Sequence, residues 1–300
     1  MISKLIFMND DLKKYRVTKN TKLKECPTNE ITFLNSNTLE EELALVSRKI
    51  ADFQNMMYAH GKYGVLICLQ GMDTSGKDSM IREIFKGFNS RGIVTHSFKT
   101  PTTKELAHDY LWRHYMALPE RGKFSIFNRT HYENVLVTRV HPQYILNEDI
   151  PRINEIEDIP HNFWKKRFNQ INDFEKHITQ NGIIIFKFLL HISKEEQRLR
   201  LLNRLEKPSK NWKFSKADME ERQYWEEYQF CYQEIIKHTS TKIAPWYIIP
   251  SDNKKAARLL VAKILWESLK KYKDIRYPEL NQETKAQLQI YKTQLENEKP

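Results

Sequence analysis

A short apolar run that leads into a glycine-bounded loop and then a lysine limits the folds open to this chain. Residues 65–79 read VLICLQGMDTSGKDS. An unbroken apolar run of this length is typical of a parallel strand that is buried on both faces. The loop runs from Gly71 to Gly76, Lys77 comes next, and apolar residues then recur at helical spacing over residues 80–85. Strand, loop, lysine and helix in this order predict a phosphate-binding loop.

The loop departs from the usual phosphate-binding pattern at two positions. Asp78 stands where the pattern has a serine or threonine, whose hydroxyl usually holds Mg²⁺. Asp73 adds a negative charge inside the loop. A carboxylate there is useful if it holds a metal ion or orients an acceptor phosphate. The alternatives are an Asx turn at Asp73 and a plain glycine turn between a core strand and a helix.

Composition and charge indicate a globular protein that attracts polyanions. The chain has 300 residues, of which 40% are hydrophobic, and a formal net charge of +11. A positive field attracts nucleic acid, nucleotides and inorganic polyphosphate alike, so charge alone does not choose between them. The three cysteines are far apart, which favours neither a disulfide framework nor a zinc site and fits a reducing cytoplasm. No apolar run approaches the roughly 20 residues of a membrane span, and the amino terminus lacks the apolar core of a signal peptide.

Strand-like and helix-like segments alternate along the chain, without internal repeats or a glycine-rich linker. This alternation predicts one doubly wound α/β domain over residues 38–280, with a parallel sheet, helices on both faces and a helical lid at about 205–222. A basic, loosely ordered arm at 1–37 would precede the domain, and a charged helical tail at 281–300 would follow it. Further strands are expected at 93–98, 124–127, 183–190 and 244–249, and helices at 39–58, 103–115, 163–178, 195–205, 218–238 and 256–271.

The polar residues that follow several predicted strands are expected to meet. In open α/β sheets, ligands bind at the carboxyl ends of the strands. The loops after Leu69, Phe98 and Phe127 should therefore share one crevice. The aromatic residues on the predicted helix at 218–238 are instead expected in the core, and they are Trp225, Tyr228, Phe230 and Tyr232.

Five segments together resemble the polyphosphate kinase 2 family. They are QGMDTSGKDS, SFKTPTTKELAHDYLWRHYMALPERG, FNRTHYENVLVTRVHP, RLEKPSKNWKFSKADMEER and APWYIIPSDNKKAARLL, in this order between about residues 61 and 267. The FNRTHYE form resembles the subgroup that phosphorylates both nucleoside monophosphates and diphosphates, whereas other branches have aspartate in place of Asn128. The resemblance implies a P-loop kinase-like fold. It also implies phosphoryl transfer from inorganic polyphosphate to AMP or ADP, reversible in principle, with Mg²⁺ or alternatively Mn²⁺.

The family's motifs place the expected catalytic residues. Its two active-site motifs fall on Asp73, Lys77, Asn128 and Arg129, and its lid motif falls on Arg204, Lys210 and Lys213. Phosphoryl transfer depends mainly on positioning and charge neutralisation, which explains the need for many cations. The predicted catalytic set is Asp73, Lys77, Arg129 and Arg204, and the predicted metal ligand is Asp73.

The donor phosphates are expected at the loop. Glycine lets the backbone approach a phosphate, and a helix N-terminus carries partial positive charge, to which Lys77 adds a full charge. Arg82 and Lys86 lie one and two turns further along the same helix and either track the polyphosphate chain or face solvent. The predicted polyphosphate-binding residues are Gly71, Thr74, Ser75, Gly76, Lys77, Asp78, Ser79, Arg82 and Lys86.

The acceptor nucleotide is expected beside the loop. Asp73 would align its phosphate through Mg²⁺ or take a proton from it. Arg129 would grip this phosphate bidentately, with a structural salt bridge as the alternative. Glu133 would supply the carboxylate that Asn128 lacks, or would be a surface acid. The predicted nucleotide-binding residues are Asp73, Asn128, Arg129, Glu133, Arg167, Lys210 and Lys213, of which Arg167 could equally pair with an acid.

The lid segment mixes cations with helix breakers. Arg204, Lys207, Lys210 and Lys213 bracket Pro208. A segment that closes over phosphates should supply charge and exclude the water that would otherwise accept the phosphoryl group. A solvated basic loop is the alternative.

Two other functions stay open at this point. An ATP-dependent nucleoside or nucleotide kinase would have serine or threonine after Lys77, and this chain has Asp78. A nucleic-acid-binding protein would mix base-stacking aromatic residues with basic ones, whereas the basic residues here gather at the loop, the strand ends and the lid. We therefore expect polyphosphate, AMP and ADP as partners, with guanine nucleotides as further acceptors, and neither nucleic acid nor a membrane. The basic arm and the tail would suit a homo-oligomer, either a dimer or a tetramer.

Overall fold

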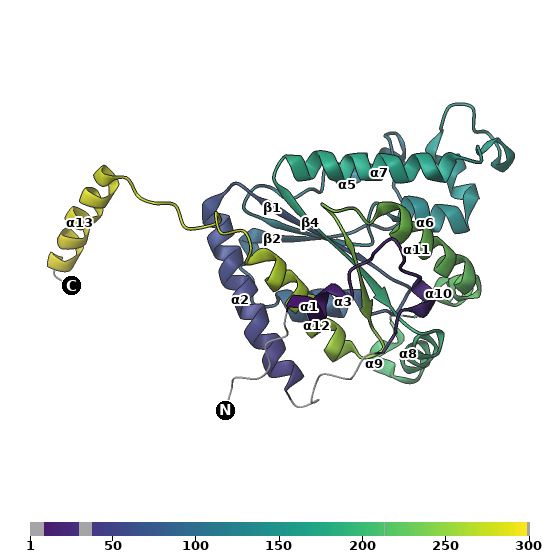
Figure 1. The fold of residues 1–300 in the computed structure, drawn as a ribbon, viewed down its shortest axis with the longest axis horizontal. Helices are drawn as coiled ribbons and strands as arrows, with labels where there is room; N and C mark the ends of the chain where they lie inside the picture. Colours follow the sequence, from purple (N-terminus) through teal and green to yellow (C-terminus); the bar gives the residue numbers. More distant parts are fainter. Residues whose placement is uncertain (1–8, 30–37, 213, 299–300) are drawn as a thin grey trace.

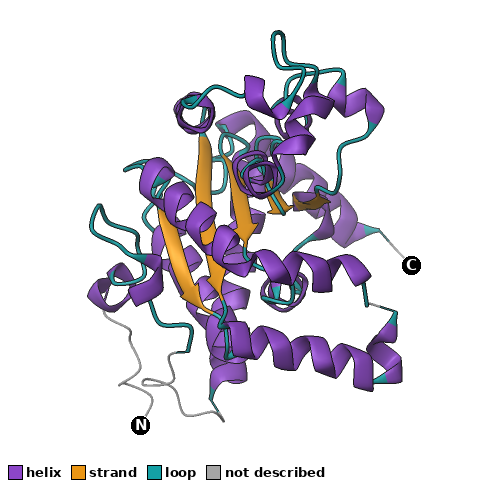
Figure 2. Cartoon of the chain, turned by 90° about the vertical axis from the view of Figure 1, so that its right-hand side faces the viewer, coloured by secondary structure: helices purple, strands orange, loops and turns teal. Residues whose placement is uncertain are grey.

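A five-stranded parallel sheet forms the centre of the computed structural model, which describes residues 9–29, 38–212 and 214–298 (Figures 1 and 2). Its spatial order is β2-β3-β1-β4-β5, and every neighbouring pair is parallel. The predicted doubly wound α/β class is confirmed. The strands are β1 (Gly64–Gln70), β2 (Ile93–Ser97), β3 (Phe124–Asn128), β4 (Ile183–His191) and β5 (Trp246–Pro250).

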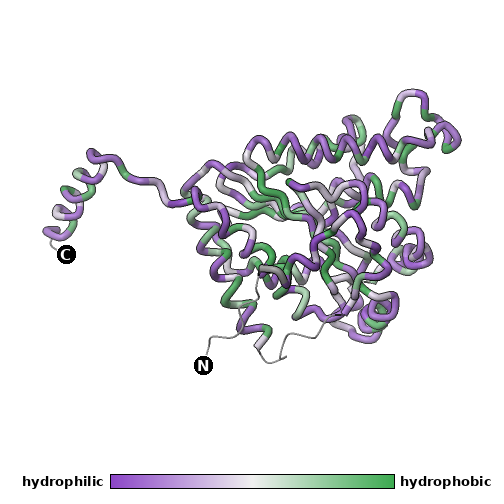
Figure 3. The backbone as a smooth tube through the Cα atoms, viewed as in Figure 1, coloured by the Kyte–Doolittle hydropathy of each residue, from purple (hydrophilic) through white to green (hydrophobic). Residues whose placement is uncertain are grey.

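Strand β1 is buried along its whole length because strands flank it on both edges and helices cover both faces. Successive side chains of a strand point to opposite faces. Val65, Ile67 and Leu69 accordingly pack with α2 (Leu39–His60), α3 (Lys77–Phe85) and α12 (Lys254–Leu269). Leu66 and Cys68 pack on the other face with α7 (Phe163–Gln180). Figure 3 shows the most hydrophobic stretches of the chain on these central strands.

The remaining helices complete the described part of the fold. Helix α6 (Glu133–Val140) and α11 (Trp225–Thr239) pack together in a second apolar cluster beside α7. The others are α1 (Asn9–Lys13), α4 (Thr103–Leu106), α5 (Trp112–Tyr115), α8 (Lys194–Glu206), α9 (Pro208–Asn211), α10 (Lys216–Glu221) and α13 (Gln282–Asn297). Short 3₁₀ turns lie at Leu23–Glu25, Ser90–Gly92, Pro142–Glu148, Ile156–Asp158 and Arg222–Tyr224.

Two of the expected helices are each broken into two. The segment 103–115 forms α4 and α5, because the Asp109 carboxylate accepts a hydrogen bond from the Leu111 amide at 2.9 Å, a local bond that competes with a continuous helix. The segment 218–238 forms α10 and α11 around a 3₁₀ turn, where the Arg222 guanidinium donates to the Lys194 carbonyl of α8. Phe230 is 55% exposed, so its expected place in the core is wrong, whereas the other three aromatic residues of that set are buried.

The described part of the amino-terminal arm packs against the body. The amide of Val17 donates to the Trp246 carbonyl at 2.9 Å, and the amide of Ile248 donates to the Tyr15 carbonyl at the same distance. Residues 15–17 thereby lie along the outer edge of β5, and Leu23 is buried further along the arm. At the other end, α13 lies away from the body with its side chains exposed (Figure 1). Within the described segments, no helix combines the length and the apolar character that crossing a membrane would require.

A buried ion pair joins the sheet to the helix layer behind it. Lys187 lies on β4 and Glu175 on α7, and both side chains are almost fully buried. The Lys187 ammonium donates to the Glu175 carboxylate at 2.6 Å, to the Tyr132 hydroxyl at 2.9 Å and to the Thr239 carbonyl at 2.7 Å. Burial alone would raise the pKa of Glu175, but the Lys187 charge and the hydrogen bond from His131 outweigh it and lower that pKa. Burial lowers the pKa of Lys187, and the three hydrogen bonds of its ammonium offset the cost of holding that charge inside.

We expect Lys187→Met to destabilise the protein by about 3–5 kcal/mol, because it leaves the buried Glu175 charge without its counter-ion. Lys176→Met removes an exposed lysine from α7 and is the matched control. The measurement is urea unfolding at neutral pH, followed by circular dichroism. A Lys187→Met protein as stable as the control would show that the ion pair does not support the fold.

Candidate active site

The phosphate-binding loop lies at the carboxyl end of β1, as predicted. Gly71 has φ +150°, and a Cβ atom there would lie 2.7 Å from the Leu190 carbonyl oxygen, so only glycine fits. Lys77 begins α3 and folds back over the loop, where its ammonium donates to the carbonyls of Gly71 at 2.6 Å and Met72 at 3.3 Å. Burial lowers the pKa of Lys77. The loop therefore holds a cation over the place where its amides can receive a phosphate.

A single arginine of α8 fixes the back of this loop. Arg200 is buried, and its Nε donates to Glu196 at 2.7 Å. Its two terminal nitrogens bind four backbone carbonyls at 2.6–3.1 Å, two in the loop and two after β5. Thr74, one of those acceptors, has φ +67°, a conformation that is uncommon outside glycine. We did not predict this role, since an arginine on an amphipathic helix looks like an exposed residue. The four carbonyls belong to Thr74, Ser75, Ser251 and Asp252.

A second cation reaches the loop from β3. Arg129 follows the last residue of this strand, with φ +60°, and its guanidinium contacts the Asp73 carboxylate at 3.1 Å. Burial alone would lower the pKa of Arg129, but the charges of Glu133 and Asp73 outweigh it and raise that pKa. Burial raises the pKa of Glu133, which opens α6 and is only half-exposed. Arg129 thus stays charged beside two carboxylates.

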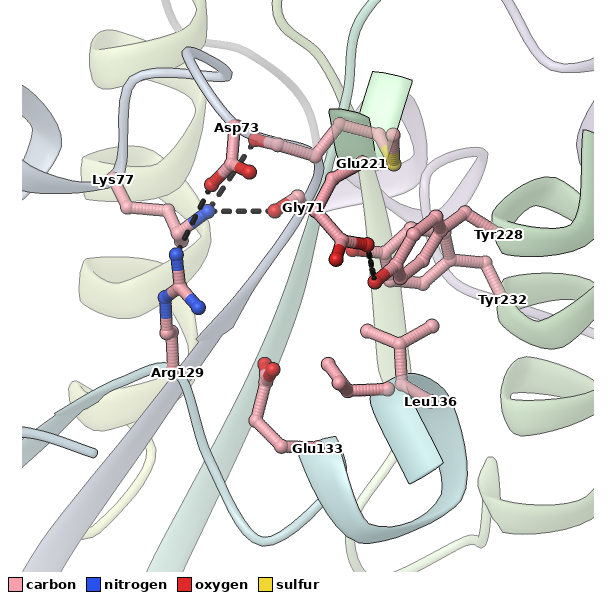
Figure 4. A pocket seen from close by; sticks show the side chains of 11 residues that line it. Gly71, Asp73, Lys77, Arg129, Glu133, Leu136, Glu221, Tyr228 and Tyr232 are labelled. Carbon is pink, nitrogen blue, oxygen red and sulfur yellow. Dashed lines mark hydrogen bonds and ion pairs between the residues drawn. The ribbon is translucent and has the colours of Figure 1, made fainter. Parts of the chain in front are cut away.

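These side chains converge in one pocket (Figure 4). One end is polar and is formed by Asp73, Lys77, Arg129 and Glu133. The opposite wall comes from α6, α10 and α11, and its members are Leu136, Val137, Glu221, Tyr228 and Tyr232. The sequence indicated the polar end. It did not indicate Glu221, and it assigned both tyrosines only to the core, although i and i+4 positions of one helix share a face.

One of the two residues that depart from the usual loop pattern, Asp78, pairs with Asn128 of β3. The Asn128 amide donates to the exposed Asp78 carboxylate at 2.6 Å. Asn128 ends β3, and Asp78 lies in the first turn of α3. The structure therefore brings Asn128 to the loop but not among the residues that line the pocket. Of the other predicted loop residues, Ser75 is buried, and the Ser79 hydroxyl donates a hydrogen bond to the Gly76 carbonyl.

The predicted lid cations that the structure describes do not line the pocket. Arg204 pairs with Asp218 of α10 at 2.6 Å, and the pKa of Asp218 is raised by burial and by the charge of Asp73. Lys210 donates to Asn203 at 2.7 Å. Among the described residues of this segment, neither Arg204 nor Lys210 lines the pocket. The expected role of Lys213 falls outside the described residues.

Three more predicted residues lie elsewhere. Arg82 on α3 and Lys86 just after its end are exposed, and both contact Glu83. Arg167 is buried on α7, donates to the Asn134 carbonyl at 2.9 Å and pairs with Glu148. Its guanidinium lies over the rings of Tyr110 and Phe163. The structure thus gives Arg167 an acid partner, and it is not among the described residues that line the pocket.

The carboxylates of the pocket suit a metal ion that arrives with phosphates. Among the described residues, no group of three or more histidine, cysteine or acidic side chains could form a metal cage. Mg²⁺ does not need one, because it usually binds through one or two carboxylates together with phosphates and water. Asp73 and Glu133 both line the polar end and supply such oxygens.

Comparison with known proteins gives concordant matches. A protein from Rhodopseudomonas palustris named ADP-polyphosphate phosphotransferase is 41% identical over 286 residues, which cover 94% of this chain and 98% of that protein. The AMP/ADP-polyphosphate phosphotransferase of Meiothermus ruber is 44% identical over 229 residues, or 76% of this chain and 80% of that protein. The crystal structure of polyphosphate kinase 2 from Arthrobacter aurescens superposes with a TM-score of 0.83 at 31% identity, covering 93% of this chain and 96% of that one.

The family model agrees with these relatives. The model described as Polyphosphate kinase 2 matches residues 33–277, which include all five strands and the phosphate-binding loop. The five resembling segments fall inside this range, so the resemblance seen in the sequence is confirmed. The chain belongs to the polyphosphate kinase 2 family.

Proposed function

We propose that this protein transfers a phosphoryl group from inorganic polyphosphate to AMP or ADP, giving ADP or ATP, in a reaction that is reversible in principle. Family membership and the printed names of the relatives support this assignment. The observation that carries it is the convergence of Lys77, Arg129 and Asp73 in one pocket at the carboxyl edge of the sheet. Two polyanions can react only where such cations offset their mutual repulsion.

The proposed roles follow from the positions of the side chains. Lys77 and the loop amides hold the donor phosphates, and Lys77 exchanges its carbonyl partners for phosphate oxygens. Arg129 binds the acceptor phosphate with its planar guanidinium. Asp73, held 3.1 Å from Arg129, orients that phosphate in line with the donor. Positioning of this kind supplies most of the catalysis in phosphoryl transfer.

The metal and the lid complete the proposed mechanism. Mg²⁺, when bound, neutralises charge on the reacting phosphates, and Asp73 and Glu133 are the residues that would hold it. Arg204 precedes the lid and Lys210 lies within it on α9, and both would add charge and exclude water as the lid closes. Guanine nucleotides are further proposed acceptors.

The first prediction concerns the donor. With long-chain polyphosphate, Mg²⁺ and AMP or ADP as acceptor, and without added ATP, the protein should form ATP, because polyphosphate supplies the phosphoryl group. The measurement is chromatography of the nucleotides over time. Activity with an ATP donor on nucleosides, and none with polyphosphate, would favour an ATP-dependent kinase instead.

The second prediction concerns Asp73. Asp73→Asn should lower kcat at least about 100-fold, because the amide can neither carry the charge that binds a metal nor take a proton. Asp173→Asn, on an exposed position of α7, is the control and should retain parental activity. Steady-state rates and thermal melting are measured on both variants. Near-normal turnover by a folded Asp73→Asn protein would rule out the role assigned to Asp73.

The third prediction concerns the metal. Excess chelator should abolish turnover, and Mg²⁺ or Mn²⁺ added back should restore it, because the pocket holds carboxylates that would otherwise repel the phosphates. The circular dichroism spectrum should not change, since the structure places these carboxylates in a pocket and not in the core. Full turnover in chelator would remove the metal from the proposed mechanism.

A further inference from the structure

Glu221 places a carboxylate at the far wall of the pocket. It is the last residue of α10, at the carboxyl-terminal end of the predicted lid, and it faces the same cavity as Arg129 and Glu133 (Figure 4). A carboxylate near a site for polyanions is costly unless it has a task, because it repels phosphate.

Two neighbours fix the orientation of this carboxylate. The Tyr228 hydroxyl of α11 donates to its Oε2 at 2.6 Å, and Nε2 of His141, the residue after α6, lies 3.0 Å from the same oxygen. Burial and the hydrogen bond to Glu221 raise the pKa of Tyr228, so the phenol remains a donor. Tyr228 and His141 thus both hold Oε2, and in the described part of the chain no hydrogen bond ends on Oε1.

The surroundings of Glu221 define what can reach Oε1. The wall beside it is formed by Leu136, Val137 and Tyr232, while the cations lie at the opposite end of the pocket. A nucleotide whose phosphate binds Arg129 would extend its nucleoside toward this wall. An ionised carboxylate oxygen only accepts hydrogen bonds, so its partner must be an N–H or O–H donor.

We propose that Oε1 of Glu221 accepts a hydrogen bond from the nucleoside of the acceptor, either from a ribose hydroxyl or from an amino group of the base. This inference rests on the proposed function. Glu221 then distinguishes the nucleotide from the second polyanion, because a phosphate chain offers neither kind of donor to Oε1. Because Glu221 belongs to α10, the same bond links the presence of the nucleotide to the position of the lid.

The test is Glu221→Gln, which keeps the size of the side chain. Its amide oxygen can still accept from Tyr228 and His141, but its N–H groups then face the pocket. The KM for AMP and the Kd of AMP from calorimetry should both rise about 10-fold or more, as expected for the loss of a hydrogen bond to a charged group. The KM for polyphosphate should change by less than about 2-fold, within the scatter of a surface substitution.

Matched variants separate this effect from a folding defect. Glu220→Gln changes the exposed neighbour on the same helix, which pairs with Lys216, and should behave as the parent. Tyr228→Phe removes one of the two donors that orient Glu221 and should raise the KM for AMP in the same direction but by less. All three proteins should have the parental melting temperature within a few degrees.

Substrate analogues identify which group of the nucleoside donates the hydrogen bond to Glu221. If a ribose hydroxyl is the partner, 2′-deoxy-AMP or 3′-deoxy-AMP binds the parent more weakly than AMP does, and Glu221→Gln no longer distinguishes them. If the base amino group is the partner, the parent binds IMP more weakly than AMP, and Glu221→Gln no longer distinguishes these two nucleotides. Equal affinity of the parent for all four nucleotides overturns the inference.

The two levels of the proposal fail in different ways. A parental protein that turns over AMP with polyphosphate, together with an unchanged KM and Kd for AMP in Glu221→Gln, overturns only the role of Glu221. Equal increases in KM for both substrates likewise contradict a nucleoside contact. A parental protein that neither binds AMP nor uses polyphosphate overturns the proposed function and this inference together.

Discussion

Parallel pairing of β1 with β3 and β4 is the constraint on which the site depends. In the observed register Leu69 lies opposite Asn128 on one side and opposite Phe188 on the other. The residues that follow β1 and β3 must therefore emerge together at one edge of the sheet. Gly71 opens the phosphate-binding loop there, and Arg129 enters from β3 with the backbone conformation that turns it toward the loop. A shift in register would separate the two cations of the pocket.

Residues whose roles depend on local pattern could be predicted from the sequence. The run at 65–69 indicated a buried strand, and the glycines and lysine that follow indicated the loop, because these features need only neighbours along the chain. Lys77 and Arg129 were predicted at one edge since parallel strands end on the same side. The helix boundaries were less accurate. The break near residue 109 follows from a local bond between Asp109 and Leu111 that the helix prediction did not include, whereas the break near residue 222 depends on a contact with α8 in the folded chain.

Residues whose roles depend on contacts between distant segments could not be predicted. Arg200 and Glu221 lie on amphipathic helices, where a charged side chain usually faces solvent, and only the packing of α8, α10 and α11 brings them inward. Arg167 was left between two roles for the same reason. Lys187 did carry a signal, because a lysine within the apolar strand 183–190 has to find a buried acid. The sequence did not say that Glu175, twelve residues earlier, would be its partner.

Helix α8 carries two of the guanidinium groups that matter to the site within a single turn. Arg200 holds the back of the phosphate-binding loop, and Arg204 pairs with Asp218 of α10. One added or deleted residue between them would rotate the second group by about 100° around the helix axis, so both attachments could not persist. The four-residue spacing between the two arginines therefore does not permit insertion or deletion.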